Sequence, residues 1–251
     1  MRSIDLNSDL GEGAGHDAEI MPLITSANIA CGGHAGDERT MRETIALALK
    51  HGVAIGAHPG YPDRANFGRN PMNMDPLALI ESVAGQIRGL VELASAADAK
   101  VTHVKAHGAM YNQADNDAGI AKSIAIGIYD DARGADLLVF AAPRSKMLEA
   151  ARAMDLRVAR EGFIDRAYEP DGTLRSRRLP GAVHTDPTVA AAQALSFLKE
   201  GGVRAHDGSF LKLEVDTLCF HGDTPGAPAI AAAVREALAR EGVAVRSAAR
   251  A

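Results

Sequence analysis

The segment VTHVKAHGAMYN, residues 101–112, decides how the rest of the chain is interpreted. Because alternate residues of a β-strand point to opposite faces, a strand here places His103, Lys105 and His107 on one face and small or apolar residues on the other. Gly108 follows at once as a turn signal. A buried ammonium without a partner costs roughly several kcal/mol, so we expect an acidic residue opposite Lys105.

The composition indicates an ordinary globular protein and excludes several classes of function. The 251 residues are 47% hydrophobic and 24% charged, which is typical of folded domains in water. A formal net charge of −5 offers no basic surface for nucleic acid. No apolar run is long enough to cross a bilayer, and the first residues enter an expected strand without an apolar leader. We therefore expect a cytoplasmic protein with neither a membrane nor nucleic acid as a partner.

Predicted strands and helices alternate along the chain, which is typical of a parallel sheet with crossover helices. Ionisable residues fall at or just beyond the carboxyl ends of these strands, where a closed barrel gathers its functional groups at one mouth. An open doubly wound sheet would use its switch-point loops, and none carries a GxGxxG motif. With no linker or repeat to mark a boundary, we predict one α/β barrel domain over residues 1–251, with seven or eight mainly parallel strands. Besides the opening segment, the predicted strands are residues 3–7, 26–30, 53–57, 137–141, 157–161 and 214–220, and the predicted helices are residues 37–50, 75–97, 117–132, 145–154, 186–199 and 228–240.

Six motifs, in this order, resemble the LamB/YcsF family, known as the A subunit of 5-oxoprolinase: DLNSDLGEG, SANIACGGHAGD, GAHPGYPDRANFGR, VKAHGAMYN, FIDRAYEPDG and HGDTPGA. The resemblance runs from about Ile4 to the last predicted helix. It implies a distorted (β/α) barrel, similar to the glycoside hydrolase/deacetylase barrel. It also implies the ATP-dependent opening of the lactam ring of 5-oxo-L-proline to L-glutamate, with ATP hydrolysed to ADP and phosphate, in a complex with subunits B and C.

The long loop at residues 59–74 is rich in Gly, Pro, Asn and Arg, and loops of this length in compact domains are often functional lids. The chain departs from the family pattern at Asn70, where a second arginine is common, and at Ala106, where proline is frequent. The first departure would weaken anion binding by the lid if binding is the role of that loop. The second concerns only the backbone.

Opening a lactam requires stabilisation of the developing oxyanion, an attacking water and a proton for the leaving nitrogen. We predict Asp9 as the partner of Lys105, holding the ammonium near a developing oxyanion or phosphate. His58 and His107 are the candidate acid and base. The substrate-binding candidates at the same mouth are Asn7, Glu12, His34, Arg144, Asp165 and His221, with Arg144 suited to a carboxylate.

Several other residues of these types have less specific explanations. His103 lies deeper on the same strand face and is expected to be a hydrogen-bonded core residue, while Asp37 fits either a helix cap or a site. The run RSRR at residues 175–178 is expected to be a solvated loop face, with a phosphate or a partner as its alternative ligand. His51 and His206 are expected in solvent, and the role of His16 is left open.

Two cysteines, Cys31 and Cys219, make neither a disulfide framework nor a four-thiolate zinc site, and a Cys31–His34 nucleophile pair is a minor alternative.

The sequence leaves the cofactors open. Asp9, His34, His58 and His107 could bind a divalent metal, although neither HExxH nor HxH occurs. The chain contains no GxxxxGK[ST] motif and no kinase-type glycine loop, so an ATP site is unconventional or lies on a partner. We therefore hypothesise that partner subunits activate the lactam by phosphorylation and that this barrel completes the opening. The competing functions are a metal-dependent carbohydrate or amide deacetylase or amidohydrolase, and a non-catalytic ligand-binding subunit.

Overall fold

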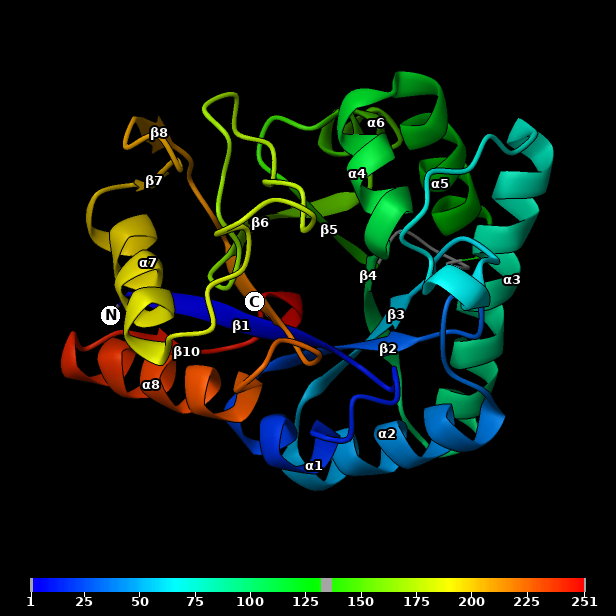
Figure 1. The fold of residues 1–251 in the computed structure, drawn as a ribbon. Coiled ribbons are helices and arrows are strands. Elements are labelled where there is room, and N and C mark those ends of the chain that lie inside the picture. Colours follow the sequence, from blue (N-terminus) through cyan, green and yellow to red (C-terminus); the bar gives the residue numbers. More distant parts are fainter. Residues whose placement is uncertain (1, 132–136, 251) are drawn as a thin grey trace.

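The computed structural model describes residues 2–131 and 137–250, and it contains the closed parallel barrel that the sequence predicts (Figure 1). Seven strands pair in parallel with their neighbours around the ring, and the ring closes where the last strand pairs with both the first and the sixth, as in the pair Asp9 and His221. The ring strands are β1 (Ser3–Leu10), β2 (Ser26–Ala30), β3 (Ala54–His58), β4 (Val101–Lys105), β5 (Leu138–Ala141), β6 (Arg157–Phe163) and β9 (Thr217–His221).

Three short strands lie outside this ring and were not predicted. β10 (Ala244–Val245) pairs with the amino-terminal end of β1. β7 (Gly202–Arg204) and β8 (Phe210–Lys212) form an antiparallel hairpin of their own. The barrel itself therefore has the lower of the two predicted strand numbers.

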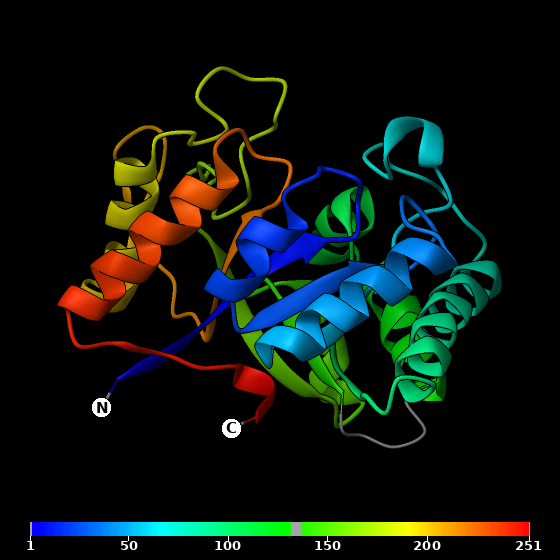
Figure 2. The ribbon, with the colours of Figure 1, turned by 90° about the horizontal axis from the view of Figure 1, so that it is seen from below.

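The helices surround the ring, as Figures 1 and 2 show from two directions. The predicted helices are present with their ends shifted by at most two residues, except that Ala132, the predicted end of one helix, lies outside the described residues. They are α2 (Glu38–His51), α3 (Pro76–Ser95), α5 (Ala118–Asp131), α6 (Lys146–Ala153), α7 (Pro187–Lys199) and α8 (Ala227–Arg240). Each helix within the described residues is too short or too polar to cross a bilayer.

Two further helices and three 3-10 turns complete the described chain: α1 (Asp17–Ile20), α4 (Gly108–Asn116), and the turns Met21–Leu23, Arg64–Asn66 and Ala248–Arg250. Gly108, expected only as a turn residue, has a positive φ of 53° and begins α4. The sequence analysis missed this helix because it starts within the segment interpreted as a strand and its turn.

Short polar residues begin the major helices, as their sequence suggests. Asp37 accepts a hydrogen bond from the Thr40 backbone N–H and forms a capping box at the start of α2, so it is a helix cap. Asp75 caps α3, whose first residue is Pro76. These caps fix where each helix leaves the barrel.

The barrel has an apolar outside and a polar inside. Outward-facing strand residues such as Leu6, Ile29 and Val104 are buried in the main hydrophobic cluster together with helix residues. Inside the ring, buried polar side chains bond to one another instead. The inward-facing polar residues are Asp5, Asn7, Asp9, Ser26, Asn28, His103, Lys105, Glu161 and Thr217.

Hydrogen bonds join these inner residues along the barrel axis. Asp5 accepts bonds from Thr217 Oγ1 at 2.6 Å and from Ser26 Oγ at 2.8 Å. Asn7 Nδ2 donates to Thr217 Oγ1 at 2.7 Å, and Asn28 Nδ2 lies 2.8 Å from both Asn7 Oδ1 and Asp9 Oδ1. The chain of bonds therefore ends at Asp9, at the carboxyl-terminal mouth.

The missing side chain of Gly56 makes room for the His103 ring inside the barrel. A Cβ at Gly56 would lie 2.1 Å from His103 Nε2, so the ring would have to move. We expect Gly56→Ala to lower the free energy of unfolding by about 1–3 kcal/mol, the usual cost of overpacking a core, as measured by urea denaturation.

Gly85→Ala is the matched control, because Gly85 is exposed in the middle of α3 and no atom lies within 4 Å of its added Cβ. This substitution is expected to raise the free energy of unfolding by about 0.5–1 kcal/mol. Equal effects of the two substitutions would contradict the tight packing of His103 on β3.

Candidate functional site

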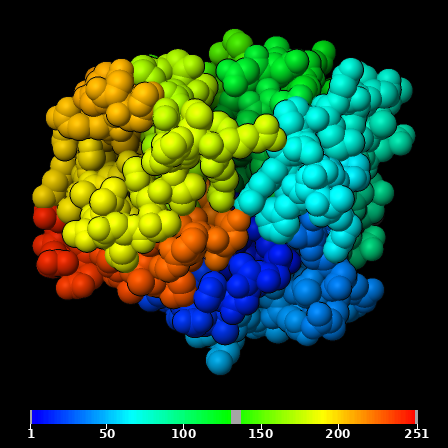
Figure 3. All heavy atoms as spheres, viewed as in Figure 1, coloured from blue at the N-terminus to red at the C-terminus, as the bar shows by residue number. Residues whose placement is uncertain are grey.

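A cavity of about 520 Å³ opens at the carboxyl ends of β4, β6 and β9. Lys105 and His107 line it from β4 and its end, and Phe163 and His221 line it from the ends of β6 and β9. The loop after β6 and the loop after β3 face each other on the surface over this region, as the yellow-green and cyan atoms of Figure 3 show. The cavity therefore lies where a parallel barrel carries its active site.

The Lys105 ammonium is the centre of the buried charges. Its Nζ lies 2.9 Å from Asp9 Oδ1, 3.1 Å from Glu161 Oε1 and 3.0 Å from Cys219 Sγ. Burial opposes a charge on Lys105, but Asp9, Cys219 and Glu161 together outweigh it and raise the ammonium pKa well above its usual value. The predicted Asp9–Lys105 ion pair is thus present, and Glu161 is a second acidic partner.

Beside this ion pair, three imidazoles and a carboxylate converge. His58 Nε2 lies 3.4 Å from Asp9 Oδ2 and 3.0 Å from His107 Nδ1. Glu12 Oε1 lies 2.9 Å from His34 Nε2 and 3.1 Å from His107 Nδ1. One donor atom from each of Glu12, His34, His58 and His107 falls within 4.8 Å of the others, and this set is called the donor cluster below.

The backbone fixes which ring nitrogens face the donor cluster. His58 Nδ1 lies 2.8 Å from the Lys105 carbonyl oxygen, and His107 Nε2 lies 2.9 Å from that of Phe67. A carbonyl only accepts, so both of these nitrogens carry protons and their partners, His58 Nε2 and His107 Nδ1, present lone pairs. In the neutral rings these two lone pairs therefore face each other and the Glu12 carboxylate, an arrangement that an added proton or a cation would stabilise.

Burial governs the charges of the donor cluster. It lowers the pKa of His34 to about 4 and also lowers that of His107. Burial alone would raise the pKa of Glu12, but its close contacts with His107 and His34 reverse the shift and lower this pKa, which favours the ionised carboxylate. For His58, burial lowers the pKa, but the Asp9 and Glu12 carboxylates together outweigh burial and raise it.

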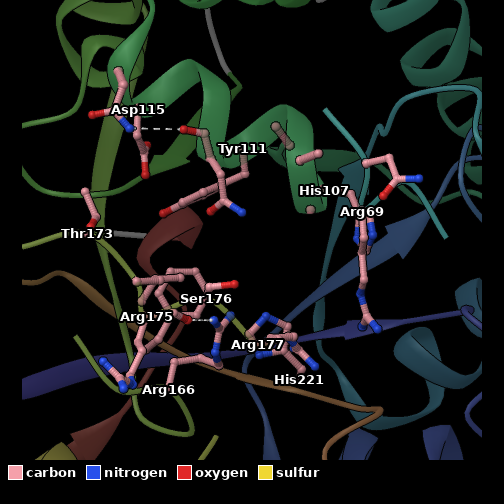
Figure 4. A pocket seen from close by; sticks show the side chains of 18 of the residues that line it. Arg69, His107, Tyr111, Asp115, Arg166, Thr173, Arg175, Ser176, Arg177 and His221 are labelled. Atoms are coloured by element: carbon pink, nitrogen blue, oxygen red, sulfur yellow. Dashed lines mark hydrogen bonds between the residues drawn. The ribbon is translucent and has the colours of Figure 1, made fainter. Parts of the chain in front are cut away.

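The side of the cavity formed by α4 carries two polar groups without partners, Tyr111 and Asp115 (Figure 4). Tyr111 Oη and Asp115 Oδ1 are buried and have no hydrogen-bond partner among the described residues. Burial, reinforced by repulsion from Glu161, raises the carboxyl pKa of Asp115 well above its usual value. This shift favours the protonated form of Asp115, which lines the cavity.

The structure brings eight of the ten sequence-predicted site residues together at or beside the mouth. Asp9, Glu12, His34 and His58 lie directly behind Lys105 and His107, and His221 lines the cavity. Asp165 accepts bonds from the backbone N–H and Nδ1 of His221, so it orients that ring.

Two predicted residues lie elsewhere. Asn7 is fully buried beneath Asp9 inside the barrel and does not line the cavity. Arg144 is exposed and donates to the Lys212 carbonyl oxygen, which keeps its guanidinium outside the cavity. Neither position supports direct contact with a substrate.

The sequence analysis missed Glu161, Asn28 and Asp115. Glu161 had a usable signal, because an acidic residue within a predicted barrel strand alternates onto the same inner face as Lys105. Asn28 has a similar signal in β2. Asp115 had none, since α4 itself was not predicted.

The remaining candidates are placed as follows. His103 is buried and bonds Asn28, as expected, and burial lowers its pKa to about 3. Cys31 donates to the Ile29 carbonyl, and burial raises its thiol pKa to about 12, so the structure shows no Cys31–His34 pair.

RSRR lines the cavity with all four of its residues rather than only facing solvent. His51 and His206 are exposed, with His206 2.6 Å from Glu169, and His16 lies 3.3 Å from Glu19, away from the cavity.

Fold and site together define a class: a seven-stranded parallel α/β barrel with a buried ammonium, carboxylates and imidazoles at its carboxyl-terminal mouth. The chain belongs to the LamB/YcsF family, whose model matches residues 4–251. The family resemblance in the sequence motifs is thereby confirmed.

Relatives and solved structures agree with this assignment. The chain is 46% identical over 251 residues to the A subunit of 5-oxoprolinase from Bordetella pertussis, covering 98% of this chain and 99% of that protein. It is 47% identical over 248 residues to the same subunit from Pyrococcus furiosus, covering 96% of each. The lactam utilization protein from Thermus thermophilus superposes with a TM-score of 0.90 at 44% identity, covering 97% of this chain and 99% of that one. The T48 deacetylase, with a TM-score of 0.50 at 13% identity over 97% of this chain and 87% of that one, shares the fold.

The stability of the barrel is expected to depend on the Lys105 ammonium. Lys105→Met would leave Asp9 and Glu161 buried without their cation, so we expect the free energy of unfolding to fall by about 3–5 kcal/mol in a denaturant titration at neutral pH. Lys146→Met is the control, because Lys146 forms only an exposed ion pair with Glu149 and should change stability by less than about 1 kcal/mol. Similar losses of unfolding free energy in both variants would show that the buried Lys105 ion pairs stabilise the fold no more than an exposed ion pair does.

Proposed function

We propose that this chain is the ring-opening subunit of an ATP-dependent 5-oxoprolinase, which converts 5-oxo-L-proline to L-glutamate. The observation that carries the proposal is the Lys105 ammonium, held 2.9 Å from Asp9 at the edge of a cavity that Asp115 also lines. Relatives named as 5-oxoprolinase subunits and a lactam utilization protein support the same substrate class.

The residues around the cavity match what lactam opening requires. Lys105 is fixed by two carboxylates, so its ammonium is preorganised to stabilise negative charge on the lactam oxygen. Tyr111 offers a hydroxyl donor beside it. Asp115, whose raised pKa favours the protonated form, is proposed to give its proton to the leaving nitrogen.

We propose that the donor cluster holds a divalent metal ion. Asp9, Glu12 and Glu161 bring three carboxylates to this region, and the Lys105 ammonium pairs with Asp9 and Glu161, so a divalent cation beside Glu12 would balance negative charge that Lys105 does not neutralise. A carboxylate with three imidazoles suits zinc or a similar ion, and the bonds of His58 and His107 to carbonyl oxygens fix their lone pairs toward it. When bound, such an ion would polarise a carbonyl or lower the pKa of a bound water.

The ATP step is assigned to partner subunits, which we propose to be subunits B and C. This chain has neither a P-loop nor a kinase-type glycine loop, whereas its relatives are named as one lettered subunit of 5-oxoprolinase, which supports a multi-subunit enzyme. ATP-dependent activation of the lactam would occur on the partners, and ring opening would occur in the barrel, in a cytoplasmic complex.

The central test is glutamate release from 5-oxo-L-proline. We expect release to require this chain, its partners and ATP together, and Asp115→Asn to lower kcat by about 100-fold or more, because the general acid is lost. Asp130→Asn, an exposed acid on α5, is the control and should retain full turnover. No release under any combination would defeat the proposed function, and full turnover by the Asp115→Asn variant would favour a non-catalytic binding subunit.

Metal content is tested separately from turnover. We expect the purified chain to carry close to one equivalent of a divalent transition metal, and Glu12→Gln and His34→Gln each to weaken zinc binding by at least about tenfold in a calorimetric titration. His51→Gln, at an exposed helix end, should bind zinc unchanged.

A metal-free chain that is fully active with its partners would contradict the metal site. In that case His58 and His107 would be the candidate acid and base, as the sequence suggested. Their facing nitrogens, His58 Nε2 and His107 Nδ1, lie 3.0 Å apart and could share one proton. Amide hydrolysis by the isolated metal-loaded chain without ATP would instead support the metal-dependent deacetylase or amidohydrolase.

A further inference from the structure

Arginines from two loops form one side of the cavity. Arg166 and Arg177 come from the long loop after β6, and Arg69 comes from the loop after β3. Figure 4 shows Arg166 and Arg177 together with His221, across from Tyr111 and Asp115. Arg69, Arg166 and Arg177 are called the arginine wall below.

Arg166 is buried without an acidic partner. Its residue is 6% exposed, and its guanidinium donates to two backbone carbonyls, from Nη2 to Arg175 O at 2.6 Å and from Nε to Ala182 O at 3.3 Å. No carboxylate among residues 2–131 and 137–250 lies within ion-pair distance of it. The neighbouring Asp165 uses its oxygens for His221 and Thr224. A buried cation in this state lacks a counter-charge, and a bound anion would supply one.

The other two arginines compete for one carboxylate. Asp223 bonds Arg69 Nη2, and its second oxygen lies 3.6 Å from Arg177 Nη1. Arg177 and Arg69 are also close enough to Arg166 to lower its pKa to about 10, after the larger effect of burial. Arg175, which also lines the cavity, is already paired with Glu169 at 2.9 Å. The three guanidinium groups therefore share one carboxylate within ion-pair distance, Asp223, which leaves two of them unmatched by an ion-paired carboxylate, although the charge of Asp165 also acts on Arg166.

We propose that the arginine wall is a subsite for the phosphoryl group of a phosphorylated, activated lactam substrate. This inference rests on the proposed function and specifies its substrate. Guanidinium groups bind phosphoryl oxygens through paired N–H donors, and a dianion matches the two unmatched charges, whereas the single carboxylate of 5-oxoproline matches one. The backbone carbonyls that hold Arg166 fix its direction before the ligand arrives.

The position of the wall fits this role. The arginine wall and the Lys105–His107 side belong to the same cavity of about 520 Å³, which is large enough for a five-membered lactam bearing a phosphoryl group. A substrate with its phosphoryl group on the arginine wall would keep its ring within the cavity that Lys105 and Asp115 also line. The partner subunits would supply the phosphoryl group from ATP, and this chain would bind the product of that transfer.

The test measures binding of inorganic phosphate to the isolated full chain by calorimetry, with acetate as the monoanion probe. We expect phosphate to bind more tightly than acetate, and Arg166→Gln and Arg177→Gln each to weaken phosphate binding by about 10- to 100-fold, the usual effect of losing a charge-assisted bond. Arg144→Gln, outside the cavity, is the control and should bind phosphate unchanged.

Asp223→Asn gives an effect of opposite sign that a folding defect would not produce. It removes the carboxylate that now neutralises Arg69 and Arg177, so we expect phosphate affinity to rise by about tenfold. In the assembled complex, Asp223→Asn should strengthen the inhibition of turnover by phosphate. Arg166→Gln and Arg177→Gln should weaken it.

Phosphate binding that is unaffected by Arg177→Gln and Asp223→Asn would overturn the proposal, because it would place the anion on the donor cluster or elsewhere. Acetate binding as tightly as phosphate would overturn it as well and would assign the wall to a carboxylate. Binding with the expected pattern but without glutamate release from the complex would leave the phosphoryl subsite standing while defeating the proposed function.

Discussion

The contact on which the site depends is the buried Lys105 ammonium between Asp9 and Glu161. These three side chains come from β4, β1 and β6, which meet only because the ring closes. Removing the Lys105 ammonium would leave the Asp9 and Glu161 carboxylates buried without a cation. The closed barrel therefore depends on the charge of Lys105, and that charge depends on the two carboxylates that the barrel brings to it. The Lys105 ammonium lines the cavity, and its ion pairs also help to hold the barrel strands in register.

The polar interior explains how that charge is held in place. Most barrel strands of this protein use their outer faces for apolar packing and their inner faces for a bonded network that runs from Asp5 through Asn7 and Asn28 to Asp9. Each member is buried and has a partner, so the network has little freedom to rearrange. The Asp9 carboxylate therefore reaches the mouth in one orientation, which fixes both Lys105 and His58.

Charges of opposite sign occupy different sides of the cavity region. Carboxylates and imidazoles gather behind Lys105 and His107, whereas unmatched guanidinium groups gather on the loops after β6 and β3. The first group suits a cation and a reacting carbonyl, and the second suits an anionic substituent of the same substrate. This separation keeps the carboxylates around Lys105 apart from the arginine groups, whose nearest acidic partners are Asp223 and Glu169.

Local sequence determined the strand faces, the helix caps and the residues that end each strand. The alternation around Lys105 required an acid across the barrel, and Asp9 meets that requirement. Tertiary structure alone decided which other groups join it. Glu161 reaches Lys105 because β5 alone separates β6 from β4 in the curved ring, and Arg166 rather than Arg144 reaches the cavity because the loop at residues 164–186 folds back over the mouth. The reason is physical: a strand's period depends on its own residues, whereas neighbours across a ring and the path of a long loop depend on contacts between residues far apart in the chain.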